Sequence, residues 1–456
     1  MNDIVNNKIS KIMKILTIIF MALVFIGILM PDAFVLTFDP HELDPKYVPQ
    51  AIIRWLQFVS FLVLPIIAFF NKDVFKKIAI YFCLPVSIIY LCFYNEMLGY
   101  HISELGRGIY QIRYLPQAIK DFMINPVFRG MLIIVPVILE IATIVLMVIK
   151  SSELFKKFDV FKFNNWKSFA IFLLVLITTT ISIIPVCVPQ HLFGYSNFIL
   201  KMFSPAHFVW IFFLVGEIIV LKLIFKNQSY ENRYIVLLIL ALSLFVQYNQ
   251  LFSRLGELTF KRMPFQLCNI AAYLAPIMLV TKNKKLFHFS LMVNVAGGII
   301  ALIVMDAEKK GIFAPANVHY IAEHNNVIVI PILCLLLNIF EPLKKKDFKD
   351  FVIGFTCYWG FILVFGTILN GIYKITGSDY FKVNYLFMFQ KDTMEGLVPL
   401  LTSWFDVQIK IGEFVLYPLI QLLVYFGLML LCFIIFFIIL KCTNRNKKQL
   451  ETIENI

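Results

Sequence analysis

One cysteine at the start of an apolar run is the residue of this chain best suited to covalent chemistry. Cys268 lies two residues after Gln266 and directly before Asn269, where the hydrophobic run 264–281 begins. A cysteine becomes a nucleophile when a base lies within hydrogen-bond reach, and a helix N-terminus favours its thiolate. His207 and His324 could supply that base, because both open apolar runs that enter from the same side. This combination predicts acyl transfer through a thioester, with one histidine moving the proton.

Side-chain amides accompany the cysteine and the histidines at a similar depth. Asn269, Gln266 or Asn325 could donate hydrogen bonds to the oxyanion of an acyl transfer. Asn294 lies in the middle of another run, beside two consecutive glycines that allow close helix approach. Uncompensated polar groups are costly in a membrane, so these side chains should face one another or a wet cavity. The candidate substrate-binding residues are Gln266, Asn269, Asn294, Asn325, Gln247, Asn249 and Gln250.

Each candidate also has a purely structural interpretation. A cysteine on an apolar helix is usually a small buried hydrophobe. His324 could be an interhelical histidine paired with Tyr320 one turn earlier, and His207 could be an interfacial capping residue. Glu217, ten residues after His207, should lie too deep to assist it. Residue types and spacing leave these alternatives open.

The composition indicates that membrane-spanning helices carry these residues. The chain has 456 residues, of which 60% are hydrophobic and 15% charged, and its mean hydropathy is +0.83. A soluble protein is nearer half apolar and a quarter charged. The apolar runs show no alternation of period two, so we expect an all-α polytopic membrane helix bundle with about twelve transmembrane helices. The runs are 12–30, 51–70, 78–94, 131–149, 168–188, 207–225, 234–252, 264–281, 287–305, 324–340, 351–373 and 414–440.

Charge orients the predicted helices. The chain has 41 Lys and Arg against 28 Asp and Glu, a net charge of +13, and the basic residues gather in alternate connections and both tails. By the positive-inside rule these segments are cytoplasmic, so both termini are expected in the cytoplasm of a plasma-membrane protein. A basic face beside anionic lipids explains the charge without nucleic acid, and membrane lipids are the expected partners.

Polarity divides the chain into parts. Residues 1–200 form an N-terminal five-helix membrane region with few polar groups at depth, Glu140 being one exception, and an outer interfacial loop at 96–129 where an amphipathic helix is expected. Residues 201–440 form a seven-helix core that carries the candidate site, and residues 441–456 form a basic cytoplasmic tail. The first five helices could bind a membrane protein partner.

Five short motifs follow one another in order after residue 203. They are Ser204-Pro205-Ala206-His207, Met263-Pro264-Phe265-Gln266-Leu267-Cys268, Ala296-Gly297-Gly298, Glu323-His324 and Asn384-Tyr385-Leu386-Phe387-Met388. From residue 203 to about 440 this series resembles the YwaF-like integral membrane proteins of bacteria. Animal relatives of that family include a cysteine acyltransferase that makes polyunsaturated ether phospholipids at a Cys-His site in the membrane. The resemblance implies that Cys268 is the acyl-accepting cysteine and His324 its partner; Gln266 stands where the bacterial pattern commonly has histidine.

Three functional hypotheses follow. The first is a membrane-embedded lipid acyltransferase or acyl hydrolase that uses Cys268 and His324, with His207 nearby, near the outer leaflet. The second is a non-catalytic transporter or binding protein for a polar small molecule or lipid headgroup, and the third is a membrane scaffold. The sequence contains no zinc-ligand spacing and no phosphate-binding loop, so neither a metal nor a cofactor is expected.

Overall fold

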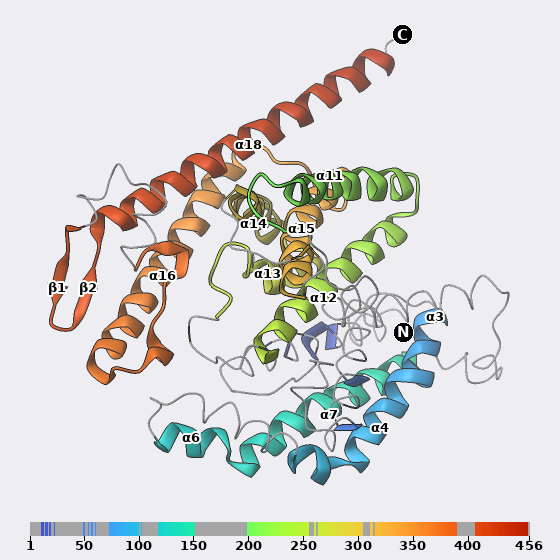
Figure 1. The fold of residues 1–456 in the computed structure, drawn as a ribbon. Coiled ribbons are helices and arrows are strands. Elements are labelled where there is room, and N and C mark those ends of the chain that lie inside the picture. Colours follow the sequence, from blue (N-terminus) through green and yellow to red (C-terminus); the bar gives the residue numbers. More distant parts are fainter. Residues whose placement is uncertain are drawn as a thin grey trace. The chain divides into compact units, whose positions relative to one another are not determined.

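The computed structural model describes six main ranges of the chain and some separate positions. The ranges are 73–99, 117–150, 198–254, 263–303, 315–389 and 406–454, and the separate positions lie between 11 and 60 and at 102, 260, 311 and 312. Helices dominate these ranges, as the composition predicts (Figure 1). The chain forms two compact units. Unit 1 comprises Met1–Asn197, Leu238–Leu258 and Lys310–His319; unit 2 comprises Phe198–Leu237, Thr259–Lys309 and Tyr320–Ile456.

A proline widens the first described span of unit 1. The span runs through α3 (Asp73–Ile78), the π-helical turn η2 (Ala79–Cys83) and α4 (Leu84–Cys92). Pro85 has no N–H to donate and its ring crowds the preceding turn, so a regular α-helical bond is lost there. The N–H of Leu84 instead reaches back five residues to the carbonyl of Ala79. Such π turns are often retained beside functional groups.

The second described span of unit 1 packs against the first. After the short helix α6 (Gln117–Met123), Asn125 caps α7 (Pro126–Lys150) by accepting hydrogen bonds from the N–H groups of Val127 and Phe128. The four residues buried between the two spans are Tyr90, Met97, Ile133 and Val137. Helix α6 falls within the predicted interfacial segment 96–129.

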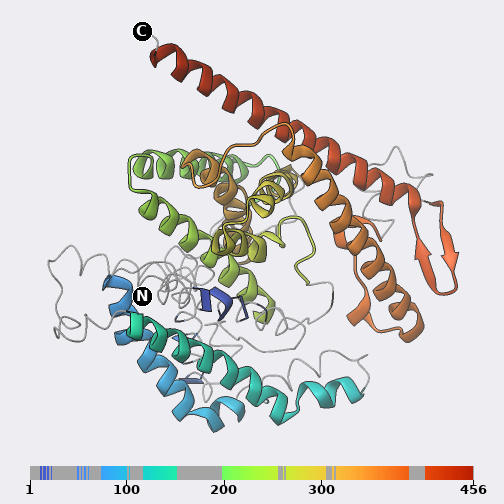
Figure 2. The same ribbon diagram turned by 180° about the vertical axis from the view of Figure 1, so that it is seen from behind.

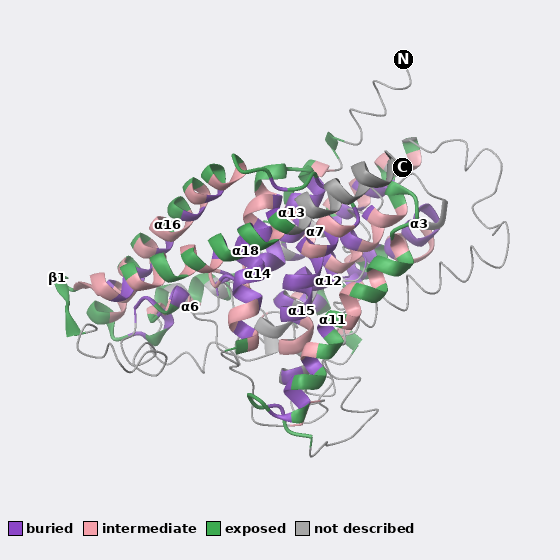
Figure 3. Cartoon of the chain, turned by 90° about the horizontal axis from the view of Figure 1, so that it is seen from above, coloured by how far each residue is buried: buried purple, intermediate pink, exposed green. Residues whose placement is uncertain are grey.

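Unit 2 is built from longer helices, and the most buried of them is α14. The helices of this part of the chain are α11 (Pro205–Phe225), α12 (Tyr230–Arg254, which continues into unit 1), α13 (Ala271–Thr281), α14 (Lys284–Ile303), α15 (Pro315–Leu336, whose first residues belong to unit 1), α16 (Asp347–Thr376) and α18 (Pro418–Glu454). Helix α14 packs against α13, α16 and α18. Its middle is almost entirely buried, whereas α11 is largely exposed (Figure 3). Small residues on α14 allow its neighbours to approach closely.

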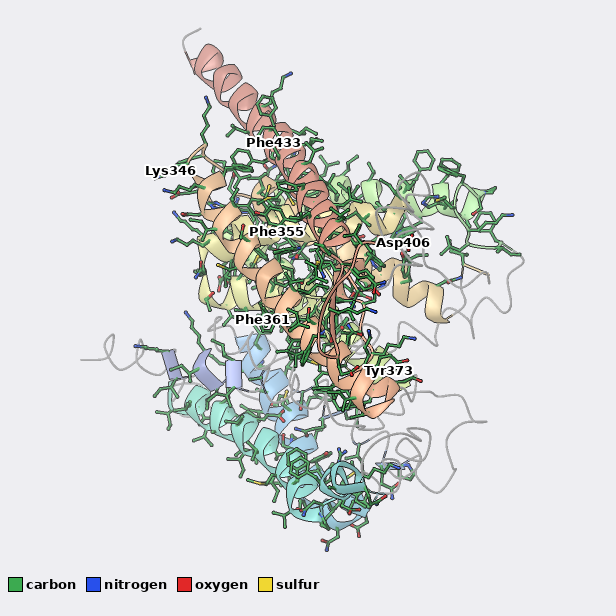
Figure 4. The ribbon with its side chains drawn as sticks, turned by 90° about the vertical axis from the view of Figure 1, so that its left-hand side faces the viewer. Lys346, Phe355, Phe361, Tyr373, Asp406 and Phe433 are labelled. Atoms are coloured by element: carbon green, nitrogen blue, oxygen red, sulfur yellow. The ribbon has the colours of Figure 1, made fainter. Side chains whose placement is uncertain are left out.

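Helices α16 and α18 contact each other in unit 2 (Figure 2). The ring of Phe348 on α16 lies 5.5 Å from that of Phe433 on α18. Figure 4 shows Lys346 at this end of α16 and Tyr373 at the other. Two 3-10 turns, η5 (Asp379–Phe381) and η6 (Tyr385–Phe387), follow α16.

A β-hairpin precedes α18 and corrects one predicted boundary. Strands β1 (Ile409–Ile411) and β2 (Phe414–Leu416) pair antiparallel around a turn in which Gly412 has a φ of 59°. The ring of Phe414 covers Gly371 of α16 so closely that a methyl group there would lie 2.3 Å from it. The apolar run predicted to be helical from 414 therefore becomes helical only at Pro418, because its first residues pair as a strand.

Six described helices are long and apolar enough to cross a membrane. They are Phe75–Cys92, Pro126–Leu146, Pro205–Phe225, Lys284–Ile303, Asp347–Thr376 and Pro418–Lys441. Each overlaps a predicted span, and two shorter apolar helices, Ala271–Thr281 and Tyr320–Leu336, overlap two more. The predicted run 168–188 and most of 12–30 and 51–70 lie outside the described residues. The protein is therefore a multi-pass helical membrane protein.

Candidate functional site

The turn that carries Cys268 precedes a helix. The N–H of Ile270 donates to the carbonyl of Gln266 at 3.0 Å, the N–H of Ala271 donates to that of Cys268 at 3.1 Å, and α13 begins only at Ala271. The apolar run continues through this turn, which is why hydropathy alone placed Cys268 within the helix. Cys268 is partly exposed as a residue, and its thiol donates to Oδ1 of Asn269 at 3.0 Å. A carbonyl-type oxygen only accepts, so the resting thiol is neutral.

Two consecutive glycines on α14 pack closely, one against the Cys268 turn and the other against α15. A Cβ atom on Gly297 would lie 2.8 Å from the backbone nitrogen of Cys268, and 2.7 Å from Cβ of Leu267. A Cβ atom on Gly298 would lie 2.3 Å from the Ile328 side chain and 3.6 Å from the carbonyl oxygen of His324. Since only glycine fits at such distances, this turn of α14 contacts the cysteine segment with one residue and the histidine segment with the next.

His324 has the tautomer that a general base needs. Its Nδ1 lies 2.7 Å from the carbonyl oxygen of Tyr320, and its ring lies 4.2 Å from the Tyr320 ring. Because a carbonyl can only accept, Nδ1 carries the proton and the neutral imidazole has its lone pair on Nε2. The pairing with Tyr320 that the sequence suggested is present, and it also fixes this tautomer. The Cys268 thiol itself donates to Asn269 rather than to an imidazole.

His207 makes a different set of contacts. Ser204 caps α11, accepting from the N–H of His207 at 3.2 Å. The imidazole Nδ1 accepts from the N–H of Phe203 at 3.1 Å, so Nε2 carries the proton and donates to the carbonyl of Leu302 at 2.9 Å. Both ring nitrogens are therefore engaged by backbone groups, and His207 ties the start of α11 to the end of α14.

Two carbonyls near the end of the described part of α14 accept hydrogen bonds from side chains of other helices. His207 donates to Leu302, and the hydroxyl of Tyr320 donates to Ala301 at 3.1 Å. Trp210 lies between these two side chains, with ring centroids 5.9 Å from His207 and 5.7 Å from Tyr320. Sequence patterns identified Tyr320 only as a partner of His324 and did not identify Trp210, whose partner Asn325 is distant in the chain.

Asn325 contacts α11. Its Oδ1 accepts from the indole N–H of Trp210 at 2.6 Å, and its Nδ2 donates to Glu217 at 3.4 Å. Glu217, expected to lie too deep to assist His207, therefore interacts with Asn325. The neighbouring Glu323 is buried and interacts electrostatically with the Cys268 thiol. Sequence patterns did not identify this interaction of Glu323.

The side-chain amide of Gln266 both donates to and accepts from a strained backbone segment. Its Nε2 donates to the carbonyl of Asn384 at 3.2 Å, and its Oε1 accepts from the N–H of Leu386 at 2.9 Å. Leu386 and Phe387 have φ values of 53° and 60°, a region that residues other than glycine rarely adopt. Tyr358 holds the other side of the cysteine turn by donating to the carbonyl of Phe265 at 2.8 Å.

The remaining predicted substrate-binding residues lie on α14 and α12. Asn294 is fully buried and donates to the hydroxyl of Ser290 at 2.6 Å, while its Oδ1 accepts no hydrogen bond from the described residues. Gln247, Asn249 and Gln250 lie on α12, and their side chains are outside the described part of the structure. Among the described residues, no three His, Cys, Asp or Glu side chains are grouped as metal ligands.

Comparison with known proteins identifies a family for the part of the chain that carries most of these residues. No curated protein and no solved structure matches the chain. A family model does match: the TMEM164 family, over residues 202–440, which is a little over half of the chain and includes Cys268, His324 and both glycines of α14. The chain belongs to the TMEM164 family of multi-pass membrane proteins.

Proposed function

We propose that the protein is a membrane-embedded lipid acyltransferase or acyl hydrolase, with Cys268 as nucleophile and His324 as general base. One observation carries this proposal. The glycine pair of α14 contacts the Cys268 turn and the His324 segment, and His324 has the tautomer whose Nε2 accepts a proton. The resemblance to YwaF-like proteins and their animal acyltransferase relatives points to the same two residues.

In the first half-reaction, the Cys268 thiol leaves Asn269 and donates its proton to Nε2 of His324. The sulfur attacks the ester carbonyl of a membrane lipid, forming a C–S bond and an oxyanion. The C–O bond of the ester then breaks, and His324 returns the proton to the departing alkoxide, so that the lipid leaves as an alcohol. The acyl chain remains on Cys268 as a thioester.

In the second half-reaction, His324 removes a proton from the hydroxyl of an acceptor lipid or from water. The oxygen attacks the thioester, the C–S bond breaks, and the sulfur regains a proton from His324. An acceptor lipid makes the protein an acyltransferase, and water makes it an acyl hydrolase. The amide of Asn269, beside the sulfur, is the nearest candidate donor to the oxyanion.

Other predicted residues position this pair. The His207 imidazole forms hydrogen bonds to backbone groups at the start of α11 and the end of α14. The Gln266 amide forms hydrogen bonds to the backbone of Asn384 and Leu386. Asn325 connects α15 to α11. The proposal therefore assigns the proton transfer to His324 and a positioning role to His207.

A direct test uses the purified full chain in vesicles of phospholipid with an isotopically labelled acyl chain. The wild type should move the label to an added lysophospholipid or release it as fatty acid, and Cys268→Ala should do neither. Cys357→Ser, at an exposed cysteine of α16, is the matched control and should keep full activity. Equal label transfer by wild type and Cys268→Ala would refute the proposal.

A second candidate function is a binding protein or transporter for a polar small molecule or lipid headgroup. The observation that favours it is the buried Asn294 Oδ1, which lies one turn from Gly298 on the same face of α14. Under this alternative Cys268→Ala retains function and Asn294→Leu abolishes it. The same pair of variants gives the opposite pattern under the acyl-transfer proposal.

The proposal includes a topology. We place about twelve spans in the plasma membrane, with both termini in the cytoplasm and lipids as partners. Reporter fusions at the two ends test this topology, because both should report the cytoplasm.

A protein that co-purifies in stoichiometric amounts and requires residues 1–200 would instead support a scaffold role.

A further inference from the structure

A second polar cluster lies inside unit 1 and shares no residue with the proposed acyl-transfer site. Its centre is Glu140 on α7, within the candidate span Pro126–Leu146 and only 1% exposed. The Nε2 of Gln57 donates to Oε2 of Glu140 at 2.5 Å, and the hydroxyls of Ser60 and Ser87 also lie beside this carboxyl. All three neighbours are buried as well. An ionisable side chain in a span is a functional candidate by default.

The hydroxyl protons in this cluster are committed elsewhere. Ser60 donates to the backbone carbonyl of Gln57, and Ser87 donates to that of Cys83, both at 2.8 Å. The two hydroxyl oxygens therefore present lone pairs to Glu140. Oε1 of Glu140 and Oε1 of Gln57 accept no hydrogen bond from any described residue. Glu140 thus accepts from the Gln57 amide through Oε2, while its Oε1 and the Gln57 Oε1 are buried acceptors left for a ligand.

The π turn of the neighbouring span also contacts this cluster through Cys83. Cys83 ends the π turn η2, and its carbonyl accepts from Ser87. The Cys83 thiol in turn faces the carbonyl of Ser60 at 3.8 Å. A π turn directs carbonyls differently from a regular helix and is often found where a ligand is held.

Charge balance identifies the class of ligand. A lone carboxylate in an apolar interior must be neutralised, and none of the described residues that interact with Glu140 is basic. Oxygen donors suit hard cations, and a single negative charge suits a monovalent ion better than Ca²⁺ or Mg²⁺. A proton would satisfy one pair of oxygens, whereas a metal ion can satisfy several oxygens together.

We propose that Glu140, Gln57, Ser60 and Ser87 bind one dehydrated alkali-metal ion of the Na⁺ class within unit 1. A proton competes for the same carboxyl, so binding strengthens as the pH rises. The other titratable group that interacts with Glu140 among the described residues is the Cys83 thiol. The inference is independent of the acyl-transfer proposal, since it involves none of the same residues.

Thermal unfolding of the full chain in mild detergent tests this site, with NaCl replacing choline chloride at constant ionic strength. Na⁺ should raise the wild-type Tm by roughly 2–4 °C in a saturable way, more at pH 8 than at pH 6. Glu140→Gln keeps the shape of the side chain without its charge, and it should remove the response. Thr143→Val is the matched control, because Thr143 is buried on the same helix and bonds only its own backbone at Leu139; this variant should keep the response.

Two results would overturn the proposal. The first is a wild-type Tm that Na⁺ raises no more than K⁺ or choline at any pH. The second concerns Arg54, which stands three residues before Gln57 in the sequence and lies outside the described residues. If Glu140→Gln lowers the Tm and adding Arg54→Gln restores it, the carboxylate is neutralised by arginine and binds no metal ion.

Discussion

His207 and His324 lie in different hydrogen-bond surroundings in unit 2. At the start of α11, His207 accepts from one backbone group and donates to another, so its imidazole is a fixed connection between helices. On α15, the Nδ1–H of His324 donates a hydrogen bond to the carbonyl one turn earlier, so the ring lone pair is on Nε2. The difference teaches that the group facing Nδ1 sets the tautomer: a donor there uses the lone pair of Nδ1, whereas an acceptor there places the lone pair on Nε2, the atom that takes the proton in the proposed mechanism.

The largest effect should come from the nucleophile itself. Cys268→Ala should lower acyl transfer by at least about 10³-fold, because no other step supplies the covalent intermediate. Its Tm should stay within a few degrees of the wild type, since Asn269 is the one hydrogen-bond partner of the thiol among the described residues. Label transfer and Tm are measured on the same preparation, and Cys268→Ala with more than a tenth of wild-type activity would contradict the prediction.

The two histidines should then separate activity from stability. His324→Gln can still donate to Tyr320 but cannot take a proton, so activity should fall about 10²–10⁴-fold with little change in Tm. His207→Ala leaves two backbone groups without their partner, at a cost of about 1–3 kcal/mol, and its remaining folded protein should stay active. Activity per folded molecule, with folding followed by Trp fluorescence, distinguishes them. The reverse pattern would exchange the roles assigned to the two histidines.

Moving the cysteine turn away from α14 should weaken catalysis without touching a reactive group. Gly297→Ala puts a methyl group 2.8 Å from the backbone nitrogen of Cys268, which forces the segments apart. A displacement of about 1 Å can cost on the order of 10²-fold in rate. Gly216→Ala on α11 is the control, since a methyl group there meets nothing within 4 Å. Equal rates for the two variants would show that this close packing is irrelevant to the chemistry.

Gln266 should behave like His207 rather than like His324. Gln266→Leu removes the partners of Asn384 and Leu386, which should cost about 1–3 kcal/mol and release the segment with positive φ values. Gln266→Glu keeps the acceptor for Leu386 and should cost less. Melting temperatures in detergent rank the two variants. If Gln266→Leu instead lowers activity per folded molecule as much as His324→Gln, then Gln266 contacts substrate.

The smallest effect is expected at the exposed ion pair between α14 and the segment before α16. Lys284, 2.7 Å from Glu341, holds the pKa of that carboxyl below its usual value. A lowered carboxyl pKa stabilises the folded state above the unfolded-state pKa, and this contribution is lost as the pH falls through the folded-state pKa. Lys284→Met should therefore make the fall of Tm below about pH 4.5 slightly shallower and leave acyl transfer unchanged. A steeper fall would reverse the sign.

Local features of unit 2 could be predicted from sequence, and long-range ones could not. The cap at Ser204 follows from a rule that spans four residues, and the apolar runs locate the helices. The predicted helix starts at 264 and 414 were wrong, since the helices begin at Ala271 and Pro418. Hydropathy does not distinguish an apolar turn or strand from a helix. The roles of His207 and Gln266 depend on Leu302 and Asn384, each about a hundred residues away, so no local pattern could have distinguished a proton acceptor from a structural connection.

The thioester on Cys268 is the most direct measure of the central claim. Wild-type protein is incubated with phospholipid, quenched in acid and digested, and the peptide that contains Cys268 is weighed by mass spectrometry before and after hydroxylamine treatment. The account predicts an added acyl mass that hydroxylamine removes, present in the wild type and His207→Ala and greatly reduced in His324→Gln. An unmodified Cys268 peptide from protein that is actively transferring acyl groups would contradict it.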